Sequence, residues 1–135
     1  MSGLQRFEDW PERLHAFVAA RSATPFAWGM HDCCIFAADA VLAVTGQDPG
    51  APWRGYSTAR VAVRRMREPG LPAIASAALG EPIAAPLAWR GDVVAVRLGR
   101  RIALGVCLGD VATVAATPTG VAMVPMIAAT AAWRV

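Results

Sequence analysis

The sequence contains no lysine and no asparagine, so its formal net charge of +3 is carried by arginine alone. An arginine-rich protein first suggests a nucleic-acid partner, and several arginines gather within residues 60–67. That run has no interleaved aromatic residues, no zinc-finger spacing and no recognisable reading helix, and it is typical of a solvated helix face. We therefore predict no nucleic-acid partner.

Charged residues are scarce as well, at 17% of the chain against 56% hydrophobic residues. This balance excludes a disordered chain, because enough apolar surface is available to build a core. A length of 135 residues allows one such core without disulfide or metal staples. We expect a single domain spanning residues 1–135, with some exposed apolar surface of the kind that suits an assembly subunit.

Cysteine is limited to Cys33, Cys34 and Cys107. An odd number of cysteines, two of them adjacent in the sequence, is a poor basis for a disulfide framework and predicts folding in a reducing cytoplasm. Zinc and iron–sulfur sites usually use spaced pairs of cysteines, which this chain lacks, so no metal or cofactor is predicted. The alternative is a site built from His31 and the three thiols, with Cys107 brought near Cys33 by a strand.

The first residues lack the apolar core of a signal peptide, so we expect the protein to be made in the bacterial cytoplasm without an export signal. Residues 111–133 carry no charge and are long enough to raise the question of a membrane span. Pro118, Gly120 and Pro125 interrupt this segment, and its threonines are frequent. It predicts two buried strands joined by a turn, and no membrane span.

Helical and strand-like patterns divide the chain into two halves. The first half predicts helices at residues 7–21, 33–45, 57–67 and 71–79. The second predicts strands at residues 93–98, 102–108, 111–116 and 121–126, with a further one at 133–135. Helices followed by a small antiparallel sheet are an α+β order.

Residues 25–44 are the stretch around which the chain is organised. Pro25 and Gly29 favour a turn, and Asp32 is placed to cap the helix that follows. Cys33 is then the first residue of that helix and lies on its apolar side. The partial positive charge of a helix N-terminus favours thiolate over thiol, which makes Cys33 a candidate nucleophile.

The same residues carry a family resemblance. Phe26-Ala27-Trp28-Gly29 followed by Asp32-Cys33-Cys34-Ile35-Phe36 resembles the tyrosine-x-tryptophan-glycine and Asp-Cys-Ser-Gly-Phe signature of NlpC-type cell-wall cysteine peptidases, a branch of the papain-like fold. Gly91-Asp92-Val93-Val94 and then Ala103-Leu104-Gly105-Val106-Cys107-Leu108-Gly109 resemble the later elements of that family, so the similarity covers residues 25–116. It implies a papain-like fold with Cys33 as nucleophile. Ala103 stands where the family has its general-base histidine, and Ala115 where its orienting polar residue is expected.

A second resemblance is to a small group of phage-encoded proteins that share the Trp-Gly-x-x-Asp-Cys turn and a closing Ala-Trp-Arg, here Ala132-Trp133-Arg134. Members of that group are commonly found among tail genes. The resemblance implies a place in the virion tail, with other phage tail proteins as partners and peptidoglycan as a further candidate.

Two hypotheses follow for the function. A papain-type nucleophile needs an imidazole within hydrogen-bond reach, and the missing histidine at position 103 favours a structural tail protein with a degenerate peptidase fold. The alternative is an active cysteine peptidase that cleaves peptidoglycan stem peptides during phage entry. His31 is then the candidate base, although side chains two residues apart at a helix start usually diverge. The residues predicted to line a substrate groove are Trp28, Asp32, Trp53 and Tyr56.

Overall fold

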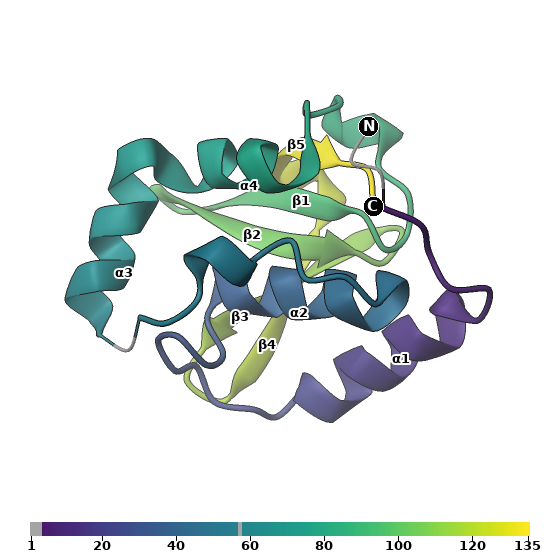
Figure 1. Ribbon diagram of the computed structural model, residues 1–135, viewed down its shortest axis with the longest axis horizontal. Coiled ribbons are helices and arrows are strands. Elements are labelled where there is room, and N and C mark those ends of the chain that lie inside the picture. The colour runs from purple at the N-terminus through teal and green to yellow at the C-terminus, as the bar shows by residue number, and fades with distance from the viewer. Residues whose placement is uncertain (1–3, 57) are drawn as a thin grey trace.

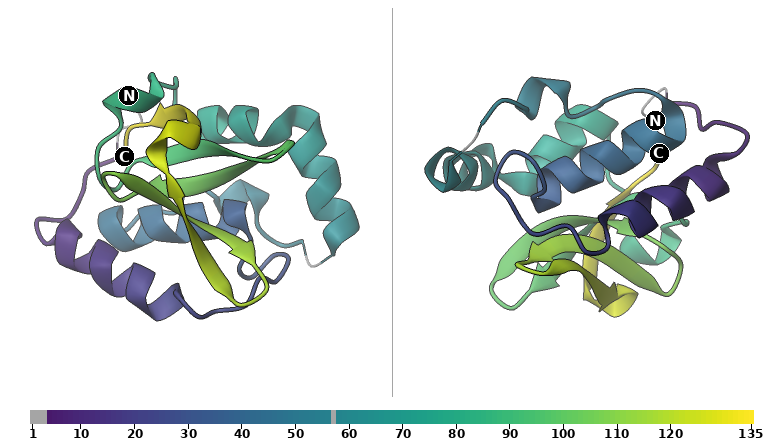
Figure 2. Two further views of the ribbon diagram at one scale, coloured as in Figure 1. Left: turned by 180° about the vertical axis from the view of Figure 1, so that it is seen from behind. Right: turned by 90° about the horizontal axis from the view of Figure 1, so that it is seen from below.

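The computed structural model describes residues 4–56 and 58–135, and it has the predicted α+β fold. Helices make up the first half of this small domain, and a five-stranded antiparallel sheet the second half. The helices lie together on one side of the sheet (Figures 1 and 2). Among the described residues, no helix combines the length and hydrophobicity needed to cross a membrane.

Two helices precede the sheet and pack against each other, α1 (Trp10–Arg21) and α2 (Cys33–Thr45). Helix α1 begins three residues later than predicted, and Phe7 lies before it with its N–H bonded to α2. That N–H donates to the carbonyl of Val44, near the end of α2, at 2.8 Å. Helix α2 begins and ends where the sequence predicts, with Asp32 as N-cap and Gly46 as C-cap at φ 76°.

The next helical region is shorter than predicted. Helix α3 (Ala59–Arg65) ends before a kinked segment, η2 (Met66–Gly70), in which Glu68 is extended at φ −146°. Pro69 follows Glu68, and a proline disfavours helical backbone in the residue before it. The predicted first residue of this helix, Ser57, lies outside the described residues. Helix α4 (Leu71–Leu79) has the predicted bounds.

The strands follow the order β4-β3-β2-β1-β5 across the sheet. Their bounds are β1 (Val93–Leu98), β2 (Arg101–Cys107), β3 (Val111–Thr117), β4 (Gly120–Pro125) and β5 (Ala129–Trp133). Short 3₁₀ turns occur at η1 (Ala51–Trp53), η3 (Ala85–Leu87) and η4 (Met126–Ala128).

Two strand predictions need correction. Arg101 is the first residue of β2 and pairs with Leu98, so the β1–β2 turn is shorter than the predicted one. The last strand begins at Ala129 instead of 133, because η4 returns the chain to the free edge of β1, where β5 pairs. This crossover places the closing Ala132 and Trp133 in the core, where each is at most 1% exposed.

Helix α2 is buried between two groups of apolar side chains. Cys33, Ala37 and Val41 form a row that packs with α4, β1 and β2. Phe36, Ala40 and Val44 form a second row, which packs with α1 and with side chains of β2 and β3. The two rows adjoin on the single apolar face that the sequence predicts, and the helix is buried beyond that face as well, at Ile35 and Ala38.

Asp92 joins the two ends of the chain. Its buried carboxylate accepts from Arg6 Nη2 at 3.0 Å, from the Val135 N–H at 3.0 Å and from the Trp89 N–H at 2.8 Å.

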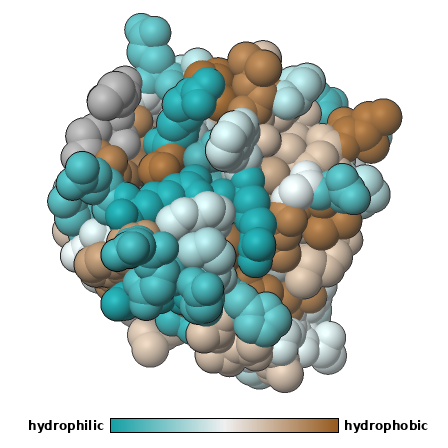
Figure 3. Space-filling view, turned by 90° about the vertical axis from the view of Figure 1, so that its right-hand side faces the viewer, coloured by the Kyte–Doolittle hydropathy of each residue, from teal (hydrophilic) through white to brown (hydrophobic). Residues whose placement is uncertain are grey.

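On the side of the molecule that Figure 3 presents, hydrophilic residues cover much of the left half, and hydrophobic residues gather toward the right.

Candidate functional site

The turn before α2 is held by a buried carboxylate. Asp32 is fully buried, and its Oδ1 accepts from the Ile35 N–H at 2.9 Å, which caps the helix. Its Oδ2 accepts from the Gly29 N–H at 2.9 Å and from the hydroxyl of Tyr56. Gly29 has φ 78°, a conformation that glycine adopts without strain. One side chain therefore fixes the turn, the helix start and the loop that carries Tyr56.

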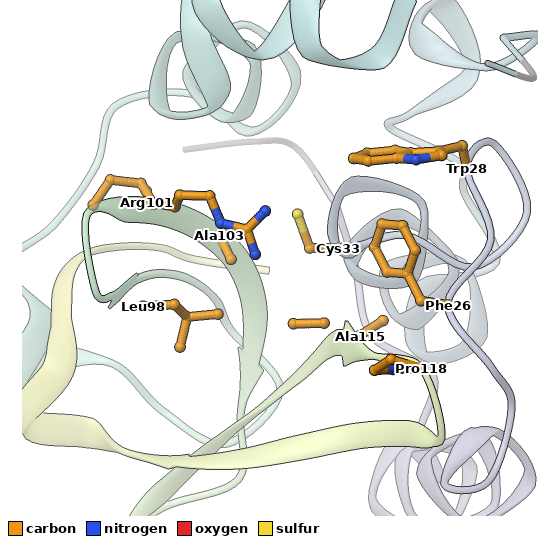
Figure 4. Close-up of a pocket in the computed structure, with 10 residues that line it drawn as sticks. Phe26, Trp28, Cys33, Leu98, Arg101, Ala103, Ala115 and Pro118 are labelled. Carbon is orange, nitrogen blue, oxygen red and sulfur yellow. The ribbon is translucent and has the colours of Figure 1, made fainter. Parts of the chain in front are cut away.

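Cys33 is placed by this cap at the wall of a cavity of about 310 Å³ (Figure 4). Phe26 and Trp28 form the aromatic side of the cavity, with ring centroids 4.7 Å apart in an edge-to-face arrangement. The remaining lining residues come from the sheet and its turns: Leu98, Arg101, Ile102, Ala103, Ala115, Ala116 and Pro118. The structure thus brings Cys33 together with both positions, 103 and 115, at which the resemblance expects polar side chains.

The thiol of Cys33 is not activated by its helix. Cys33 is only 7% exposed, and this burial raises the pKa of its thiol to about 11. Backbone hydrogen bonds from Leu104 and Cys34 and the guanidinium of Arg101 favour the thiolate, but their combined effect is smaller than that of burial. At neutral pH Cys33 is a neutral thiol, contrary to the expectation drawn from its place at a helix N-terminus.

His31 does not contact Cys33 as a base. Its ring is buried and packs edge-to-face on Phe36, with centroids 5.6 Å apart. Neither ring nitrogen has a hydrogen-bond partner among the described residues. His31 is not among the residues that line the cavity beside Cys33. Burial, assisted by the charge of Arg21, lowers the pKa of His31.

The four residues predicted to line a substrate groove do not lie together in the structure. Trp28 lines the cavity, whereas Asp32 and Tyr56 are buried in the hydrogen-bonded turn and do not line it. Burial, together with the hydrogen bond to Asp32, raises the pKa of Tyr56, so its hydroxyl stays a donor. Trp53 packs over the other side of α2, near Cys34 and Ile74.

The sequence does not predict Arg101 as a site residue, because the strands predicted at residues 93–98 and 102–108 leave it in the turn between them. In the structure it begins β2 and points its guanidinium toward Cys33 (Figure 4). A signal was present in the sequence. Side chains two residues apart in a strand lie on the same face of the sheet. Arg101 therefore faces the same side as Ala103, the residue that the resemblance places beside Cys33.

The described residues hold no group of three or more His, Cys, Asp or Glu side chains that would bind a metal ion. Cys107 lies at the far end of β2, where its sulfur accepts from the Gly109 N–H at 3.4 Å. The three cysteines, all within the described residues, form no disulfide.

These features define a small α+β domain with a cysteine at a helix N-terminus beside an apolar cavity. The chain belongs to the DUF6950 family, a domain of unknown function, whose model matches residues 5–135. No match was found among the curated proteins.

We expect the Asp32 carboxylate to be a main source of local stability. Asp32→Ala leaves buried donors without an acceptor and should lower the free energy of unfolding by about 3 kcal/mol. Tyr56→Phe removes one donor and should cost about 1–2 kcal/mol. Urea denaturation measures both, with the exposed Glu81→Ala as control. Equal stability of Asp32→Ala and the control would contradict this role.

The buried His31 should make the protein less stable in acid. Because its pKa is lowered in the folded state, the unfolded chain binds the proton first as the pH falls below the ordinary value of about 6.5. Stability is then lost progressively below that pH, and it is retained above it. Thermal unfolding at pH 7.5 and pH 5 should show a smaller difference for His31→Leu than for the natural protein. The exposed His15→Gln is the matched control and should keep the full difference.

Proposed function

We propose that this protein is a structural, tail-associated subunit of a phage or prophage, with an NlpC-like site that has lost its catalytic base. The observation that carries the proposal is the composition of the cavity beside Cys33. Both wall positions expected to be polar are alanines, Ala103 and Ala115. A cysteine peptidase needs an imidazole there to remove the thiol proton and a further group to orient that imidazole.

The state of Cys33 supports the same proposal. With a pKa of about 11, only about one thiol in ten thousand is ionised at pH 7. A catalytic thiol is instead shifted to a pKa below its ordinary value by a neighbouring cation or base. His31 does not line the cavity, and its ring nitrogens make no hydrogen bond within the described residues, so it is not placed as that base.

The tail association is supported by the sequence resemblance. Large apolar side chains are exposed at Trp89 (73%) and Ile127 (95%), and they are available to a partner subunit. The closing Ala132-Trp133 pair has a packing role, since Trp133 Nε1 donates to Ser76 Oγ at 3.1 Å within the core.

One observation favours the alternative, an active cysteine peptidase that cleaves peptidoglycan stem peptides during phage entry. Cys33 faces a cavity large enough for a substrate side chain, and Arg101 beside it favours the thiolate. Such an enzyme requires a histidine from a partner chain, because the described residues place none beside the thiol.

The rate of alkylation reports the ionisation and accessibility of the Cys33 thiol. Iodoacetamide between pH 5 and pH 9, followed by mass spectrometry, should modify the buried Cys33 only slowly, and more slowly than the half-buried Cys34. Stem-peptide fragments should remain intact with the natural protein and with Cys33→Ser alike. Selective alkylation of Cys33 at pH 6, or cleavage abolished by Cys33→Ser, would favour the peptidase.

A matched pair of variants tests the geometry behind this prediction. Ala103→His places an imidazole in the cavity beside the thiol and should raise the alkylation rate of Cys33 at pH 7 by about tenfold or more, because an adjacent imidazolium lowers a thiol pKa. Ala103→Leu fills the same space without a base and should not raise that rate. Circular dichroism verifies that both variants fold.

Tail association is tested on purified phage particles. Mass spectrometry of particles released by a host that encodes this chain should detect it at a constant ratio to the other tail proteins. The separated heads of the same preparation are the control. Recovery of the chain only from the cell lysate, with none in the particles, would overturn the proposed localisation.

A further inference from the structure

The cavity beside Cys33 has a composition that suits one kind of ligand. Its aromatic side is formed by Phe26 and Trp28, and Leu98 and Ile102 add aliphatic surface. The alanines are short and leave the space open. A volume of about 310 Å³ lies at the lower end of the range found for small-molecule sites, about 300–1,000 Å³. It is enough for one aromatic or branched apolar group, and too small for a long segment.

Arg101 gives this apolar cavity a single positive charge. It is the one charged residue among the described residues that line the cavity. It forms no ion pair with any acidic side chain in the described part of the chain, in contrast to Arg6, Arg13, Arg21 and Arg54. The guanidinium points across the cavity toward Cys33 (Figure 4), whose thiol is neutral and provides no counter-charge.

The backbone of Arg101 is well defined, and its side chain is exposed at the cavity wall. The backbone begins β2 and pairs with Leu98 of β1, so the side chain starts from a rigid sheet. A guanidinium on a rigid base recognises a planar carboxylate through two parallel N–H···O bonds. The buried carboxylate of Asp32 already accepts from three donors, which belong to the turn, the helix start and a following loop.

We propose that this cavity binds an apolar carboxylate, with the carboxylate on Arg101 and the apolar group between Phe26 and Trp28. Two sources share this chemistry: a small aromatic acid, and the free C-terminus of a peptide that ends in an apolar residue. The binding needs no reaction at Cys33, so it holds whether or not the protein is a peptidase.

The test compares matched ligands on the full chain. We expect 3-phenylpropanoate to shift the indole resonance of Trp28 in NMR titrations, and 3-phenylpropanamide, which lacks the charge, to bind at least about tenfold more weakly. A peptide ending in Ala-Phe with a free carboxylate, compared with its C-terminal amide, covers the second source. Binding of the small acid alone assigns the site to small acids, and tighter binding of the free peptide assigns it to chain termini.

Matched variants identify the residue responsible. Arg101→Gln should weaken binding of the acid about tenfold or more, whereas Arg100→Gln, the neighbouring arginine that does not line the cavity, should leave it unchanged. Ala103→Leu fills the cavity and should abolish binding of acid and amide together. Equal binding of acid and amide, or equal binding by the natural protein and Arg101→Gln, would overturn the proposal. So would the absence of any binding to the natural protein.

Discussion

The buried carboxylate of Asp32 is the constraint on which the site depends. A buried charge is costly unless each oxygen is hydrogen bonded, and here both oxygens are satisfied by groups from three different parts of the chain. The Gly29 N–H closes the turn, the Ile35 N–H begins α2, and the Tyr56 hydroxyl holds the following loop. Because Cys33 is the next residue, its position relative to the sheet is set by this network. The cavity wall is therefore fixed by hydrogen bonds that lie behind it.

Two opposing effects act on the Cys33 thiol, and their sizes decide its chemistry. A helix N-terminus stabilises a negative charge by about 0.3–1 kcal/mol at an exposed site. Burial in an apolar core acts in the other direction, and the raised pKa of about 11 shows that it is the larger effect. Catalytic cysteines overcome such effects with a neighbouring imidazole or other cation. With Ala103 at the wall, only the backbone hydrogen bonds from Leu104 and Cys34 and the charge of Arg101 oppose burial, and together they are the smaller effect.

Much of the fold was predictable, because it depends on local signals. The bounds of α4 and β1 follow from glycine and proline breaks and from the change in hydrophobic period, and the cap at Asp32 follows from residue type alone. What the sequence did not provide were features set by distant contacts. Phe7 lies before α1 and is bonded to Val44 near the end of α2, and β5 is placed by pairing with β1. Arg101 faces the cavity because of the register of the β1–β2 hairpin, and a shift of one residue in that register would turn its side chain to the other face of the sheet.

The cavity depends on the short side chains of its wall. In a close-packed interior an alanine leaves a volume beside it unless larger neighbouring groups fill the space. Here Ala103 and Ala115 project from β2 and β3, and the start of α2 is held by the Asp32 network, so the neighbours are not free to close the gap. The two alanines therefore border a volume of about 310 Å³ beside a neutral thiol. A wall that cannot take a proton from Cys33 still surrounds a space with aromatic sides and one guanidinium, and such a space favours binding over chemistry.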